Sequence, residues 1–123
     1  MKIRRNRLNK FYLRKRIPKK DKEGNSYEEW GEPVSFVGEQ WPASGKVQVQ
    51  QYGDRLNYIL NLKLDGAYQV IPEKQGASFD LGNGLVFREQ DGICIFTDGK
   101  SDPDYRIIAI KSYRQLKMEL EKI

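Results

Sequence analysis

The chain has no histidine and a single cysteine among its 123 residues. Without histidine, a His-based catalytic triad, a His metal site and most pH switches near neutrality are excluded. The cysteine, Cys94, lies between apolar residues in the run GICIFT, which predicts a small buried thiol and not a ligand or nucleophile. A single cysteine also excludes a disulfide framework within one chain.

Long apolar runs are missing as well. None approaches the roughly 20 residues that span a bilayer, and no apolar segment follows the basic N-terminus in the manner of a signal peptide. We therefore expect a soluble protein made and kept in a reducing cytoplasm, without a membrane partner.

Acidic residues are absent from the first 20 positions, which hold ten of the chain's 22 Lys and Arg residues. The other 12 basic residues are outnumbered by all 17 acidic ones, so the rest of the chain has a formal charge of −5. The length fits one domain with one core. The charge pattern predicts a mildly acidic body that carries a basic N-terminal segment.

Residues 1–10 show no periodicity and are expected to form a flexible basic arm, while residues 11–123 are expected to form a single domain. A first strand is predicted from Phe11 and is closed by a turn in KKDKEGNS. A second strand is predicted over 27–37, and its interruption near Gly31 indicates a bulge or an edge position.

The stretch SGKVQVQQYGDR at 44–55 has two interpretations. Its valines favour a strand, whereas the glutamine run and Gly53 favour a short helix from Lys46 to about Tyr52, which we prefer slightly. The next run, 57–64, alternates well and predicts a half-buried strand with Tyr58 and Leu60 on the apolar face.

Turn signals recur about every ten residues in the second half of the chain. Strands are predicted at AYQVI, ICIFT, YRIIAIKSY and LKMELEKI, with a hairpin turn at GNG (82–84). The expected fold class is all-β, a small antiparallel β-barrel with long loops and at most one short helix. Closure is favoured because open sheet edges promote aggregation.

No pattern in the chain carries recognisable catalytic chemistry. The GNG run lacks the spacing of a phosphate-binding loop. The acids of DGKSDPD lack the distal Glu and central Gly of an EF-hand, so a solvated turn is favoured over a calcium site. The acidic pairs Glu28–Glu29 and Glu119/Glu121 are coupled to nothing that suggests acid–base work. We predict no enzyme activity, no metal and no cofactor.

The basic arm is the clearest electrostatic signal. Interleaved with Asn6, Phe11 and Tyr12, its cations suit contacts with DNA phosphates, which counterion release would favour at low salt. A solubilising tail or an arm that docks on an acidic protein is the alternative. The candidate contact residues are Arg4, Arg5, Arg7 and Lys10.

Several runs together carry a resemblance to a known family. These are DKEGNSYEEWGEPVSFVGEQWPASGKVQVQQYGDRLNYILNLKLDG, DGICIF, SDPDYRIIAIKSY and MELEKI. Over about residues 11–123 the chain resembles the small head–tail connector proteins of siphophages and prophages of Gram-positive bacteria. These are the head closure or stopper proteins, also called head–tail joining or adaptor proteins. The resemblance implies a structural protein built as a small β-barrel with a long projecting loop.

In that family twelve copies form a ring below the portal and its adaptor, and loops reach into the channel to hold packaged DNA until the tail attaches. The resemblance thus implies portal, adaptor and tail-completion partners and possible contact with packaged DNA. It also implies assembly in the host cytoplasm, a final place in the virion, and a monomer in isolation. Two alternatives stay open: a tail-completion protein of the same connector, and a small nucleic-acid-binding barrel. The segment 70–89 is longer than expected for the family, and the Arg-rich first ten residues are unusual for it.

If the connector interpretation holds, subunit or partner contacts are expected within 44–57. The candidate residues are Lys46, Gln50, Tyr52, Asp54 and Arg55; of these, Tyr52 has the alternative of packing beneath its own loop. The predicted core consists of Trp30, Tyr58, Leu60, Leu62, Cys94, Phe96, Tyr105, Ile107, Ala109, Met118 and Leu120, and substitutions there should reduce stability first.

Overall fold

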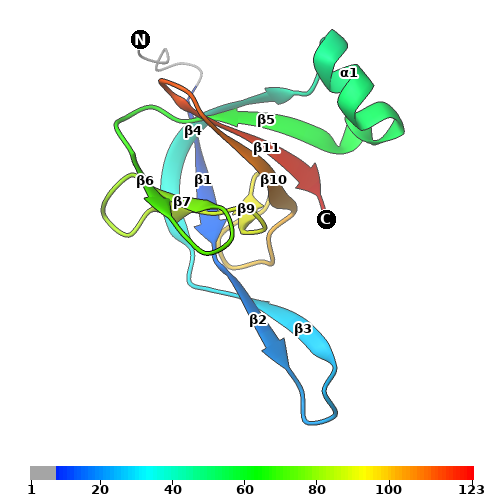
Figure 1. Cartoon of the computed structure of the whole chain (residues 1–123), viewed down its shortest axis with the longest axis vertical. Coiled ribbons are helices and arrows are strands. Elements are labelled where there is room, and N and C mark those ends of the chain that lie inside the picture. Colours follow the sequence, from blue (N-terminus) through cyan, green and yellow to red (C-terminus); the bar gives the residue numbers. More distant parts are fainter. Residues whose placement is uncertain (1–7) are drawn as a thin grey trace.

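Six antiparallel strands close into a barrel in the computed structural model, which describes residues 8–123. Around the barrel their order is β1 (Asn9–Arg14), β4 (Val34–Pro42), β5 (Ile59–Lys63), β11 (Leu116–Lys122), β10 (Tyr105–Ser112) and β9 (Gly92–Cys94). Figure 1 shows the two further strand groups and the helix arranged outside this barrel. The predicted all-β barrel with one short α-helix is confirmed.

Two strands form a hairpin that belongs to no other sheet. β2 (Arg16–Lys20) pairs with β3 (Ser26–Trp30), and the hairpin extends away from the barrel at the bottom of Figure 1. The chain leaves the hairpin through Gly31–Pro33 before β4 begins. The predicted interruption near Gly31 therefore separates two strands of different sheets, because Pro33 donates no backbone hydrogen bond to a ladder.

A three-stranded sheet occupies much of the long segment after β5. It contains β6 (Gln69–Pro72), β7 (Ala77–Asp80) and β8 (Val86–Phe87). The predicted GNG turn joins β7 to β8, and all three of its residues have positive φ, which glycine and asparagine tolerate best. Phe79 and Phe87 are buried in the main core, so this sheet is packed against the barrel.

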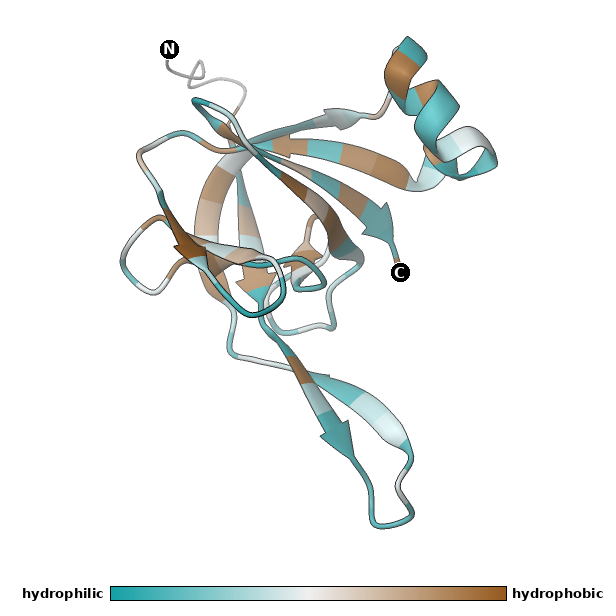
Figure 2. Ribbon diagram, in the orientation of Figure 1, coloured by the Kyte–Doolittle hydropathy of each residue, from teal (hydrophilic) through white to brown (hydrophobic). Residues whose placement is uncertain are grey.

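The main core lies inside the barrel, where apolar residues alternate along the strands (Figure 2). The register brings inward-facing residues of neighbouring strands together: Leu62 pairs with Met118, and Phe11 pairs with Phe36. Phe36 also packs edge-on against Phe87, with ring centroids 5.2 Å apart. The buried core set is Phe11, Leu13, Phe36, Leu62, Leu64, Phe79, Phe87, Ile93, Ile95, Tyr105, Ile107, Leu116, Met118 and Leu120.

Two residues of the predicted core are in fact exposed. Tyr58 is 55% exposed because it ends a 3-10 helix outside the barrel, one residue before β5 begins. Phe96 is 72% exposed because β9 ends at Cys94 and the chain bends away. Cys94 is a buried free thiol as predicted. Of the remaining predicted core, Trp30, Leu60 and Ala109 are only half-buried, whereas the others are buried.

The run Asp-Pro-Asp-Tyr (102–105), which leads into β10, packs against β9 and the residues that follow it. Pro103 lies so close to Gly92 that a Cβ there would stand 2.3 Å from its Cγ atom. Asp104 accepts hydrogen bonds from the backbone N–H groups of Ile95 and Phe96, at 2.8 and 3.0 Å. This loop is thereby held against the end of β9.

Candidate interaction surfaces

The predicted helix over 46–52 is present and packs on the outer face of the barrel. α1 (Lys46–Tyr52) continues into the 3-10 helix η2 (Gly53–Tyr58). Gln48 and Tyr52 are its two buried residues, and their spacing of four places them on one side of the helix. Tyr52 packs with Ala43 and Ile59 in a second, smaller apolar cluster.

A buried polar network joins α1 to the barrel. The Gln48 Nε2 donates to Asn61 Oδ1 at 2.7 Å and to Glu119 Oε2 at 2.6 Å. The Asn61 Nδ2 and the backbone N–H of Ser44 both donate to Gln48 Oε1. The second carboxylate oxygen of Glu119 has no hydrogen-bond partner, but Lys111 Nζ lies 3.6 Å from it. A charge so deeply buried needs these partners.

The five predicted contact residues of the segment 44–57 fall into two groups. Lys46, Gln50 and Asp54 are exposed and available to a partner. Tyr52 is instead buried beneath its own helix, and burial together with the nearby Glu119 charge raises the pKa of its phenol to about 12. The Arg55 guanidinium forms a two-point ion pair with Glu121 at 2.6 and 2.7 Å, which lowers the pKa of that carboxyl.

The outward face of α1 carries apolar side chains as well. Val47 is 73% exposed and Val49 is 49% exposed, and they flank Lys46 and Gln50 on the side of the helix opposite Gln48. This mixture of two valines, an amide and an ammonium group suits a protein partner better than a small ligand.

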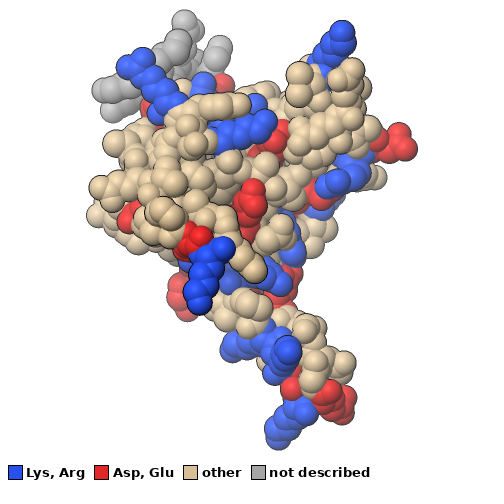
Figure 3. Space-filling model, in the orientation of Figure 1, with Lys and Arg blue, Asp and Glu red and all other residues tan. Residues whose placement is uncertain are grey.

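The β2–β3 hairpin is a largely exposed element. All five residues of β2 and three of five in β3 are exposed, among them the apolar side chains of Ile17 and Tyr27. Blue and red atoms alternate along it in Figure 3. Arg16 pairs with Glu28 at 2.7 Å and Lys19 pairs with Glu29 at 2.9 Å across the two strands. Since these cations are paired with carboxylates across the strands, the hairpin does not present a uniformly basic surface.

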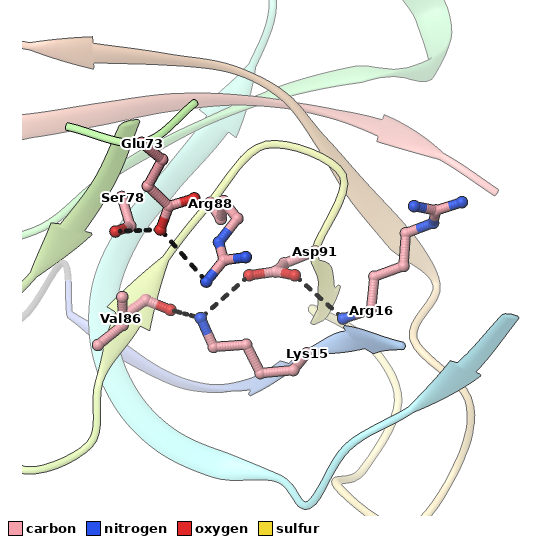
Figure 4. A network of polar contacts seen from close by, with 7 residues as sticks. All are labelled: Lys15, Arg16, Glu73, Ser78, Val86, Arg88 and Asp91. Carbon is pink, nitrogen blue, oxygen red and sulfur yellow. Dashed lines mark hydrogen bonds and ion pairs between the residues drawn. The ribbon is translucent and has the colours of Figure 1, made fainter. Parts of the chain in front are cut away.

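The base of the hairpin is fixed to the barrel by buried and half-buried polar groups (Figure 4). Asp91 accepts from the backbone N–H of Arg16 at 3.0 Å and pairs with Lys15 Nζ at 3.3 Å. The Lys15 ammonium also donates to the carbonyl of Val86. Burial raises the pKa of the Asp91 carboxyl despite these two partners.

Two arginines make further contacts at the junction between the hairpin base and the barrel. The Arg14 guanidinium donates to the carbonyls of Gly31, Trp30 and Ser101 at 2.7, 3.2 and 2.7 Å. Arg106 pairs with Glu28 and lies over the ring of Trp30, 5.7 Å from its centroid. The hairpin therefore leaves the barrel at a defined angle instead of hanging from a loose linker.

An open cleft of about 890 Å³ lies between the hairpin base and the β6–β7 turn. Arg16 and Pro18 line one side, and Glu73, Arg88 and Asp91 lie among the residues that line the rest. Two of its cations are already paired: Arg88 lies 3.5 Å from Glu73, and Arg16 pairs with Glu28.

Asp98 and Asp104 both accept hydrogen bonds from backbone N–H groups. Asp98 Oδ1 accepts from the backbone N–H groups of Lys100 and Ser101 at 3.0 and 3.1 Å. These contacts lower the pKa of Asp98. Within residues 8–123, no three His, Cys, Asp or Glu side chains are grouped so as to hold a metal ion.

The N-terminal candidates can be placed only in part. Arg4, Arg5 and Arg7 lie outside the described residues. Lys10 belongs to β1, with its Nζ 5.6 Å from the centroid of the Tyr12 ring, so the last two residues of the predicted arm are in a strand. No helix of the described part of the chain is long and apolar enough to cross a membrane.

The sequence predicts only part of the hairpin. DKEGN separates two β-prone runs, but the single strand predicted over 27–37 is two strands, β3 and β4, in different sheets. Nothing in the sequence indicates the network around Glu119, since the alternation of β11 places that carboxylate on an outer face.

The fold class is thus a closed β-barrel with a helix docked on one side and a hairpin projecting at one end. Comparisons with protein-family models, curated proteins and solved structures find no match to this chain.

Proposed function

We propose that this chain is a structural subunit of a phage head–tail connector, a head closure or head–tail joining protein without catalytic activity. Its copies form a ring below the portal and adaptor, help to retain packaged DNA and attach the tail. The proposal combines the resemblance described above with the shape of the chain. A tail-completion protein of the same connector is the closest alternative.

The observation that carries the proposal is the projecting β2–β3 hairpin. An isolated two-stranded hairpin is marginally stable in water, and this one leaves Ile17 and Tyr27 exposed. Its base is nevertheless held by Asp91, Lys15 and Arg14. A rigidly aimed hairpin with exposed apolar side chains gains most when it docks on another protein. It is also a better candidate than segment 44–57 for the long projection that the resemblance implies.

The outward face of α1 offers a second, separate surface. Ring formation requires two different patches on each copy, because a head-to-tail contact is heterologous. The hairpin and the exposed face of α1, with Lys46, Val47 and Gln50, meet this requirement.

The test is electron microscopy of lysates from the parent phage or prophage with this gene deleted. Free tails beside heads that have lost their DNA are expected. DNA-filled heads beside defective tails would favour the tail-completion alternative, and normal infectious virions would overturn the connector proposal.

Complementation then tests the hairpin. The wild-type gene should restore virions, whereas an Ile17→Ser/Tyr27→Ser variant should not, although its isolated subunit stays folded because both side chains are exposed. A Val70→Ser/Ile71→Ser variant is the matched control, since it removes two similarly exposed apolar side chains from β6. Full rescue by the hairpin variant would assign the contact to another surface.

A further inference from the structure

Three lysines stand side by side across the outer face of the barrel. The strand register pairs Lys111 of β10 with Lys117 of β11, and Lys117 with Lys63 of β5. Directly opposed residues of antiparallel strands have Cβ atoms about 5 Å apart. Neighbouring residues on each strand, such as Leu116, Met118 and Leu62, are buried in the core, so the lysines point outward. We refer to Lys63, Lys111 and Lys117 as the lysine row.

The lysine row is unfavourable for the fold itself. Like charges placed directly opposite each other destabilise a sheet, and Lys117 faces a lysine on both sides. Lys111 is partly compensated by Glu119, 3.6 Å away, and Glu39 of β4 is paired in register with Lys63 at the end of the row. Lys117 lies over the indole ring of Trp41, 5.8 Å from its centroid. No carboxylate is paired in register with this central lysine.

Further cations surround the row. Arg114 is exposed in the turn that joins β10 to β11, and Lys10 is paired with Val37, two residues before Glu39. With the row they make five cations on these strands and their connecting turn. Figure 3 shows Lys and Arg side chains gathered around this upper end of the barrel.

The chain also enters the barrel at this end. β1 begins at Asn9, which is paired with Gly38 next to Glu39. The preceding sequence adds Lys2, Arg4, Arg5 and Arg7 without any acid.

We propose that the lysine row is a binding surface for the phosphate backbone of a nucleic acid, without base specificity. Lys and Arg contact phosphates by releasing counterions, whereas lysine is depleted at the core of protein–protein interfaces. A phosphate chain crossing the strands would relieve the repulsion between the lysines. This surface is distinct from the hairpin and from the arm, and it does not depend on the connector proposal.

The experiment measures binding of fluorescently labelled, mixed-sequence duplex and single-stranded oligonucleotides to the full chain over a series of salt concentrations. A Lys63→Gln/Lys117→Gln variant should bind more weakly and lower the slope of log K against log salt. The expected drop is about 0.9 per lysine on duplex or about 0.7 on single strands. Lys111 is left intact because it compensates the buried Glu119.

Stability and a charge-matched control separate binding from folding. The lysine variant should keep or raise the melting temperature, because it removes like-charge repulsion. A Lys22→Gln/Lys100→Gln variant loses the same charge from the hairpin tip and the 97–104 loop, where both lysines are exposed. It should keep the wild-type slope.

Three results would overturn the proposal. One is an equal loss of slope in the control variant, which would indicate a net-charge effect. Another is complete loss of binding when only Arg4, Arg5 and Arg7 are changed to Gln, because the arm alone would then account for affinity. The third is binding to polyglutamate but to neither oligonucleotide, which would assign the lysine row to an acidic protein. All three leave the microscopy test of the connector untouched.

Discussion

Glu119 is completely buried although it lies on the outer face of β11. Its strand neighbours Met118 and Leu120 point into the barrel core, so the alternation of the strand alone would leave its carboxylate in water. Helix α1 covers it instead, and Gln48 and Lys111 compensate the buried charge. At the residue scale, this carboxylate explains why an element outside the barrel has a fixed place.

The titration of Tyr52 measures the same contact, the packing of α1 on the barrel. Its phenol has a pKa of about 12 in the folded protein, mainly because of burial, against about 10 for a free tyrosine. Since the folded state holds this proton more tightly, the stabilisation is fully present below pH 10 and is lost as the pH rises to about 12. Tyr52→Phe should reduce the alkaline loss of stability, measured by urea unfolding at several pH values; burial also raises the pKa values of Tyr105 and Cys94, so part of the loss stays.

The controls for Tyr52 concern packing. Tyr52→Phe keeps the ring and should cost less than about 1 kcal/mol at neutral pH, while Tyr52→Ala should cost about 3 kcal/mol. Tyr58→Phe removes the hydroxyl of an exposed ring and should leave the alkaline loss in place. If Tyr52→Ala left stability unchanged, the buried position of Tyr52 would be wrong, and a partner-contact role would regain support.

At the element scale, α1 is too short to be stable alone. It has seven residues, without a side-chain cap, and isolated helices of this length are marginal in water. Its position depends on Gln48, which bonds both Asn61 and Glu119. The helix was predictable from the glutamine run and the following glycine, whereas the face it presents to the barrel was not.

Gln48→Ala should destabilise the chain by about 1–3 kcal/mol, because it leaves buried polar atoms of Asn61 and Glu119 without a partner. Hydrogen exchange of the amides in 46–58 should accelerate more than that of β10. Gln51→Ala is the matched control: the side chain is exposed on the same helix, and alanine favours helix slightly. Equal effects of the two substitutions would contradict the network as the anchor of α1.

For the β2–β3 hairpin, too, the sequence indicates that the element forms but not where it lies relative to the barrel. The turn residues DKEGN and the flanking β-prone runs indicate two strands, yet nothing local shows that they leave the barrel. That direction depends on Asp91, which is about 75 positions away from Lys15 and Arg16 along the chain. A contact of this range becomes visible only after the barrel has closed.

At the scale of the whole molecule, the closed barrel leaves no free strand edge of its own, while the hairpin and the β6–β7–β8 sheet do. Free strand edges are then confined to the additions outside the barrel. Such surfaces are small, so a ring built from them gains from being templated by a partner that presents several sites.

Under the connector proposal, the isolated chain is expected to be a monomer in dilute solution and to form a ring only on a portal or adaptor partner. Sedimentation velocity over a range of concentrations checks the first part. A stable dimer that persists on dilution would contradict it, and would point to a self-complementary interface instead of a head-to-tail one.

The sequence by itself determined the class of fold. Its local signals are the alternation of apolar and polar residues along the strands, the turn residues at regular intervals, the GNG turn and the helix over 46–52. The GNG turn and the helix both appear in the structure, because short-range sterics determine them. The core was predictable only in part. Leu62, Cys94, Tyr105, Ile107, Met118 and Leu120 are buried as predicted, whereas Phe96 and Tyr58 are exposed because a strand ended earlier or began later than expected. The buried Phe36, Phe79 and Phe87 were not among the predicted residues.

Tertiary structure alone decided which polar residues became buried and which charges met. Asp91 with Lys15, Glu119 with Gln48, and the alignment of Lys63 with Lys117 join residues far apart in the chain. Their proximity follows from barrel register, in which a shift of one residue would turn every side chain to the opposite face. Register is set by the packing of the whole core, and no local pattern contains it.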